Sequence, residues 1–109
     1  MLAGNVSAYT DDGLLFVIGD SSPNIVQIVG TAQGVEVSGT DTTINGSQSV
    51  VSINGPFRHA FIQMNRGDDI ATVQNLNVQK KLKLQGNAGS DELRVSNISA
   101  GQFETWLGV

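Results

Sequence analysis

Residues 62–73, with the sequence IQMNRGDDIATV, contain the pattern that decides the fold. Two apolar residues, Ile62 and Met64, stand two positions apart and precede a corner rich in Gly, Asp and Asn. An aliphatic residue then resumes at Ile70. Alternating apolar residues are typical of a β-strand, and Gly, Asp and Asn are typical of tight turns. The stretch therefore predicts two strands joined by a tight corner.

The same pattern occurs four times along the chain, as one apolar pair followed by one polar corner. The corners are IGDSSPNI at 18–25, VSGTDTTI at 37–44, MNRGDDI at 64–70 and LQGNAGSDEL at 84–93. The pairs before them are Phe16 with Ile18, Val35 with Val37, Ile62 with Met64, and Leu82 with Leu84. In a parallel β-solenoid each rung, meaning one turn of the solenoid, stacks its inward side chains ~4.8 Å from those of the previous rung. We therefore expect an all-β chain that forms one domain over residues 1–109, a right-handed parallel β-solenoid (β-helix) of about four to five rungs.

The alternative fold is a β-sandwich of antiparallel strands. A length of 109 residues suits an immunoglobulin-like domain, and Asn45-Gly46 and Asn54-Gly55 are both signals for tight hairpin turns. Antiparallel hairpins give no reason for one pattern to recur four times, so the solenoid is the preferred interpretation.

Composition supports an all-β chain and excludes several classes of partner and site. Twelve Val, eight Ile and thirteen Gly stand against three Glu and three Lys, which is a composition of strands and turns. The absence of cysteine excludes disulfides and a thiol nucleophile. A net charge of −4 with only six Lys and Arg argues against nucleic acid as a partner. The longest apolar run, 14–18, is too short for a membrane-spanning helix of ~20 residues, so no membrane insertion is expected.

Catalytic residue patterns are missing from the sequence. His59 is the only histidine and Tyr9 the only tyrosine, and no Gly-rich phosphate loop or metal-ligand spacing occurs. Ser and Asp are plentiful, but nothing in the sequence positions them beside His59 as a triad requires. We therefore expect that the protein is not an enzyme.

Acidic residues gather at the expected corners and form a candidate metal site. If the corners stack, Asp68, Asp69, Asp91 and Glu92 come close together on one edge, and hard oxygen ligands suit Ca²⁺. The alternative is that Asp tolerates the tight backbone of a turn. These four residues are therefore the candidate Ca²⁺ ligands, and no other cofactor is expected.

The aligned corners resemble those of a known group of proteins. The opening MLAGNVSA, followed by GLLFVIGDSSPNIVQI, VEVSGTDTTING, MNRGDDIATVQNLNV and LKLQGNAGSDELRV, is similar to the repetitive, secreted β-solenoid proteins of planctomycete bacteria. This resemblance implies a noncatalytic protein that is exported to the cell surface or the extracellular space. Residues 86–94, GNAGSDELR, also resemble the nonapeptide of calcium-binding RTX β-rolls, although Asn87 replaces a Gly and the motif occurs once.

The C-terminal segment predicts an incomplete fifth rung. Residues 97–105, NISAGQFET, place Phe103 and Thr105 at the positions that Leu82 and Leu84 occupy in the previous repeat. An incomplete rung leaves backbone groups unpaired and is a template for another chain. The chain is then a piece of a longer repeat array, or a neighbour completes the rung, or the tail folds back as a helical cap.

Two functions from different classes fit these observations. The first is an extracellular structural protein whose copies stack head to tail into a homo-oligomer, filament or surface assembly. The second is a Ca²⁺-stabilised adhesion or binding module excised from a larger secreted repeat protein. The residues expected at the stacking contact are Val6, Ala8 and Leu14 at one end and Phe103, Thr105, Trp106 and Leu107 at the other.

Overall fold

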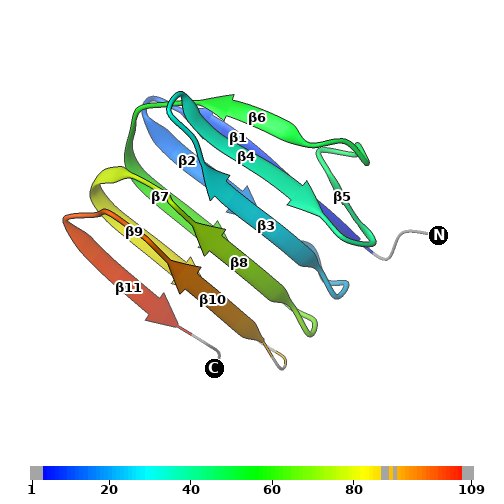
Figure 1. The fold of residues 1–109 in the computed structure, drawn as a ribbon. Helices are drawn as coiled ribbons and strands as arrows, with labels where there is room; N and C mark the ends of the chain where they lie inside the picture. The colour runs from blue at the N-terminus through cyan, green and yellow to red at the C-terminus, as the bar shows by residue number, and fades with distance from the viewer. Residues whose placement is uncertain (1–3, 87–88, 90, 107–109) are drawn as a thin grey trace.

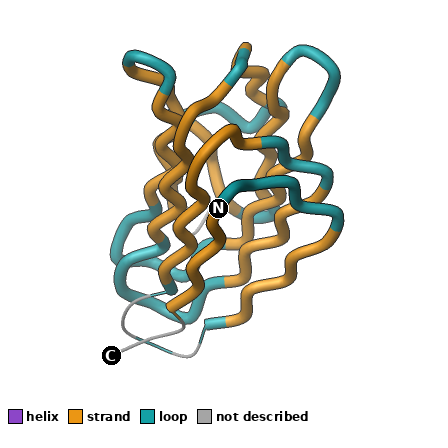
Figure 2. Tube along the Cα trace, turned by 90° about the vertical axis from the view of Figure 1, so that its left-hand side faces the viewer, coloured by secondary structure: helices purple, strands orange, loops and turns teal. Residues whose placement is uncertain are grey.

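The computed structural model describes residues 4–86, 89 and 91–106, which form eleven β-strands in two sheets (Figure 1). The six-stranded sheet contains, in spatial order, β11 (Gln102–Trp106), β9 (Val78–Gln85), β7 (Phe57–Gln63), β2 (Leu14–Ile18), β1 (Gly4–Asp11) and β5 (Thr42–Ile44). The five-stranded sheet contains β10 (Glu92–Ser96), β8 (Ile70–Gln74), β3 (Ile25–Gly30), β4 (Gly34–Gly39) and β6 (Val51–Asn54). The sheets form two layers around one aliphatic core, seen from the side in Figure 2. The prediction of an all-β chain is confirmed.

Both sheets are mixed, so the predicted parallel β-solenoid of four to five rungs is wrong, and the β-sandwich alternative is supported. Strands β2, β7, β9 and β11 pair in parallel, as do β3, β8 and β10. In contrast, β1 pairs antiparallel with β2, and β4 pairs antiparallel with both β3 and β6. The repeat therefore predicts the parallel ladders correctly but not the strands at the N-terminal side of each sheet.

The predicted parallel stack fails at the second repeat. After β3 the chain reverses and forms β4 in the same sheet, instead of crossing to the other sheet. After β8, Asn75 takes a left-handed backbone conformation (φ 57°), and the side chain of Leu76 is fully buried in the core. The register of β3 and β8 places Gly30 and Thr31 at the corresponding positions. No aliphatic side chain is available there to fill the inner corner. The Thr31 Oγ1 instead accepts from the Gly34 N–H at 3.1 Å and closes a hairpin, so Val35 lies on an antiparallel strand.

Inward positions of the parallel ladder form aliphatic columns between the sheets. Val17, Ile62 and Leu84 lie in register across β2, β7 and β9, and all three are buried. Burial of Met64 and Leu82 likewise matches the prediction. Every position of 14–18 is apolar, so alternation alone does not specify which side chains face inward.

The prediction that Phe16 and Ile18 point into the core is wrong. Leu15 and Val17 are fully buried, whereas Phe16 and Ile18 lie on the outer face of the same strand, half-buried. This shift by one residue moves an aromatic ring from the core to the surface of the sheet.

Alanine substitutions on β2 test this assignment. Leu15→Ala is expected to lower the free energy of unfolding by about 2–5 kcal/mol, because it leaves a cavity between the sheets. Ile18→Ala, three residues along the same strand, is expected to cost about 1 kcal/mol because the Ile18 side chain lies on the outer face and already contacts water in the folded state. Urea denaturation of both variants measures the difference. A larger loss for Ile18→Ala than for Leu15→Ala would reverse the assignment of the two faces.

Candidate functional site

A column of polar side chains stacks at the corner that leads into β3, β8 and β10. Asn24, Asp69 and Asp91 each precede one of these strands by one residue. The Asn24 N–H donates to Oδ1 of Asp69 at 2.8 Å, and the Asp69 N–H donates to Oδ1 of Asp91 at 3.1 Å. Asn24 and Asp69 are fully buried. The Asp69 and Asp91 side chains thus each satisfy a backbone donor of the layer before.

The corner holds two carboxyl groups with incomplete hydrogen bonding. Oδ2 of Asp69 and Oδ2 of Asp91 are buried, and neither has a hydrogen-bond partner. Burial raises the pKa of Asp69 to about 7 against the lowering effect of the Asn24 N–H, and the negative charge of Asp91 adds to the increase. Burial and the neighbouring charge of Asp91 therefore favour a retained proton on Asp69.

The four candidate Ca²⁺ ligands are only partly brought together. Asp69 and Asp91 are in contact, while Asp68 is exposed and Glu92 forms an ion pair with Arg94 on the outer face of β10. Over residues 4–86, 89 and 91–106, no group of three His, Cys, Asp or Glu side chains gathers in a way that could hold a metal ion. The stacking of the corners was predicted correctly for Asp69 and Asp91, but the donor set is smaller than the sequence indicates.

The residues expected to form the N-terminal stacking contact do not lie at an open edge of a sheet. Strand β1 lies between β2 and β5, and the side chains of Val6 and Ala8 are buried in the core. Leu14 begins β2 and is half-buried beside His59 of β7. The prediction fails here because β1 and β5 cover the first repeat, which the sequence pattern treats as the outermost layer.

The contact residues expected at the C-terminal end lie on the last strand of the six-stranded sheet. Among the described residues, strand β11 pairs with β9 alone, with Phe103 opposite Leu82 and Thr105 opposite Leu84. Phe103 is 44% exposed, although the equivalent positions in the layers before it are buried. The alternative in which the tail folds back as a helical cap is wrong for residues 102–106, which are strand. The Trp106 side chain and Leu107 lie outside the described residues.

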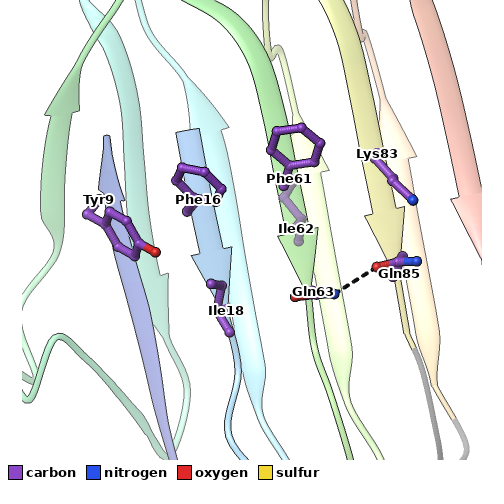
Figure 3. Close-up of a pocket in the computed structure, with 8 residues that line it drawn as sticks. All are labelled: Tyr9, Phe16, Ile18, Phe61, Ile62, Gln63, Lys83 and Gln85. Carbon is purple, nitrogen blue, oxygen red and sulfur yellow. Dashed lines mark hydrogen bonds between the residues drawn. The ribbon is translucent and has the colours of Figure 1, made fainter. Parts of the chain in front are cut away.

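A groove on the outer face of the six-stranded sheet was not predicted from the sequence. It has a volume of about 320 Å³ and lies between an aromatic row, which includes Phe16 and Phe61, and a second row that includes Gln63 and Gln85 (Figure 3). The available signal was the alternation of 57–63, FRHAFIQ, because an inward Ile62 forces Phe61 and Gln63 outward.

No protein-family model, no curated protein and no solved structure matched this chain. Within the described part of the chain, no helix is long and apolar enough to cross a membrane.

The Asp69 carboxyl group predicts a dependence of stability on pH. Its folded-state pKa, about 7, lies above the ordinary value of 3.8, so between these values the folded state retains a proton that the unfolded state has lost. The free energy of unfolding should therefore decrease as the pH rises from about 4 to about 7, and this contribution should be constant above pH 7. Asp69→Asn keeps an Oδ1 acceptor for Asn24 and adds a donor for Asp91, so it should flatten the decrease.

Urea denaturation between pH 4 and pH 8 measures this dependence. Asp11→Asn is the matched control, because Asp11 is exposed and lies on β1, in the other sheet. Parallel profiles for the parent and Asp69→Asn would show that Asp69 does not retain its proton in the folded state.

Proposed function

We propose that this chain is a noncatalytic structural protein of the cell surface or extracellular space, and that two copies join through their open C-terminal edges. One observation carries the proposal. Both sheets end on the same side of the molecule in a five-residue strand, β10 in one and β11 in the other (Figure 1). Extracellular location and the absence of catalysis rest on the resemblance to secreted planctomycete repeat proteins.

The β10 edge offers backbone groups for pairing. The Glu92 N–H donates inward to the carbonyl oxygen of Asp69 at 2.8 Å. Because backbone groups alternate in direction along a strand, the N–H and C=O groups of Leu93 and Val95 point to the open side. Such a row of groups is a template for another strand. Together with the exposed ring of Phe103 on β11, this edge combines free backbone groups with apolar surface.

At the opposite end of the molecule, the edge of the six-stranded sheet is blocked by its own chain. Strand β5 has three residues, and the Ile44 N–H and C=O bond to Ser47, at 2.8 and 2.9 Å, within the following turn. The Asn45 side chain bonds both backbone groups of Ala8, accepting at 2.8 Å and donating at 2.9 Å, and so occupies the edge of β1 beyond β5. Short and self-bonded edges resist pairing. This asymmetry favours the association of two like ends over the head-to-tail stacking expected from the sequence.

The charges on β10 are self-complementary about a two-fold axis. Glu92 and Arg94 lie on its outer face, while Leu93 and Val95 lie toward the core. An antiparallel pairing centred on Leu93 places Glu92 of each copy opposite Arg94 of the other. Closed dimers use such isologous contacts, in which one surface patch meets its own copy.

Charge variants on β10 test the proposed dimer by sedimentation velocity over a range of protein concentrations. The parent is expected to dimerise, and Arg94→Glu is expected to weaken dimerisation about tenfold, because it places like charges opposite one another. The matched variant Glu92→Arg with Arg94→Glu exchanges the two charges and should restore the parent affinity.

Both variants are expected to fold, since the two side chains are exposed, and circular dichroism checks this. A parent that stays monomeric at every concentration would overturn the proposal. Fibres that lengthen with concentration would favour head-to-tail stacking, which also overturns pairing of like ends.

A second candidate function is a Ca²⁺-stabilised adhesion or binding module of a larger secreted protein. It is favoured by the unpartnered Oδ2 atoms of Asp69 and Asp91, which a bound cation would neutralise. In this case CaCl₂ should raise the melting temperature at pH 8, EDTA should reverse the change, and Asp91→Asn should abolish it. An unchanged melting temperature in CaCl₂ would remove this candidate.

A further inference from the structure

Two rows of side chains run across the strands on the outer face of the six-stranded sheet. Tyr9, Phe16 and Phe61 occupy directly opposed positions on β1, β2 and β7. Two residues further along β7 and β9, Gln63 lies directly opposite Gln85. Figure 3 shows the aromatic row and the amide row side by side, with the groove between them. Because side chains on one face recur every two residues, the rows are separated by about 7 Å.

The aromatic row is continuous. The ring centroids of Tyr9 and Phe16 are 5.1 Å apart with planes inclined at 23°, and those of Phe16 and Phe61 are 5.6 Å apart at 21°. Tyr9 is 46% exposed, and both Phe side chains are half-buried. The row therefore presents apolar ring surface to solvent, with the polar hydroxyl group of Tyr9 at one end.

The amide row provides both kinds of hydrogen-bonding group. Nε2 of Gln63 donates to Oε1 of Gln85 at 3.0 Å, which fixes the orientation of the two amides relative to each other. This bond leaves Oε1 of Gln63 as an acceptor and Nε2 of Gln85 as a donor on the same side of the groove. An oriented donor and acceptor beside an aromatic surface are features of a specific binding site rather than of a general apolar patch.

We propose that this groove binds a neutral oligosaccharide. A pyranose ring has an apolar face of C–H groups and a rim of hydroxyl groups that both donate and accept hydrogen bonds. The aromatic row matches the C–H face, and the two Gln amides match the hydroxyl rim. The row crosses three adjacent strands spaced by ~4.8 Å, so its length suits an extended sugar chain rather than an ion.

Charge distinguishes a neutral ligand from an anionic one. Lys83, which lies opposite Phe61 on β9, is the one charged residue among those that line the groove. The whole chain carries a net charge of −4, which repels polyanions such as nucleic acids and sulfated glycans. A peptide that binds by adding a strand would need a free strand edge, and the groove lies on strands that are paired on both sides.

Cross-strand aromatic contacts also stabilise sheets without any ligand, so the test must separate binding from stability. The probes are cellohexaose, laminarihexaose and mannohexaose, added to the ¹⁵N-labelled protein and followed by NMR. At least one of them is expected to bind with a dissociation constant near or below about 1 mM. Binding should shift the side-chain amide signals of Gln63 and Gln85 and the ring signals of Tyr9.

Substitutions in the amide row provide the decisive comparison. Gln63→Ala removes an exposed side chain and leaves the aromatic row in place, so it should weaken binding at least about tenfold with little change in melting temperature. Gln74→Ala is the matched control, an exposed Gln on β8 in the other sheet, and should bind as the parent does.

Three outcomes would overturn the proposal. The first is the absence of binding by all three neutral oligosaccharides. The second is an equal affinity of Gln63→Ala and the parent, which would show that the amide row does not contact the ligand. The third is tighter binding of a heparin hexasaccharide than of any neutral probe, which would assign the groove to anions through Lys83.

Discussion

The in-register stacking of parallel strands is the constraint on which the rest of the structure depends. It places Asp69 beside Asp91 and Asn75 beside Asn97, where the Asn97 amide donates to the Asn75 side chain at 3.0 Å. Gly67 and Gly89 also stack at one corner with φ of 104° and 108°, and a Cβ on Gly89 would collide with the carbonyl oxygen of Gly67. Because strand spacing is fixed by backbone hydrogen bonds, equivalent residues of successive layers must accept the same conformation.

The same stacking explains why the two ends of the molecule differ. Each added strand offers a new edge to the next, so backbone pairing alone does not limit the number of strands in a parallel ladder. On the N-terminal side the antiparallel strands β1 and β4 interrupt the ladder. One sheet then ends in the three-residue strand β5 with its self-bonded turn, and the other in the four-residue strand β6. On the C-terminal side β10 and β11 are the last strands of their sheets, and the apolar column ends at the exposed Phe103. The proposed association through this edge follows from that difference in protection.

Stacking also acts on the outer face of the sheet, where it produces rows rather than isolated side chains. The register that buries Val17 against Ile62 places Phe16 against Phe61 on the opposite face, because successive side chains alternate between faces. Edge pairing through β10 and ligand binding in the groove use separate surfaces of the molecule, so each can be tested without disturbing the other. Together they describe a scaffold whose edge and outer face are both available for contact.

Local sequence determined the strands and the corners, because alternating apolar residues and the turn preferences of Gly, Asp and Asn act over a few residues. Spacing alone also predicted that Leu82 and Leu84 stack on earlier layers and that Asp69 lies near Asp91. Only the tertiary structure decided which face of LLFVI is buried and whether β4 pairs in parallel with its neighbours. Those choices depend on whether an aliphatic residue fills the inner corner and on which strands lie alongside, and both are contacts between distant parts of the chain. The groove could not be predicted from the sequence pattern for the same reason. Its two rows form only when the register of β1, β2, β7 and β9 places these four strands side by side.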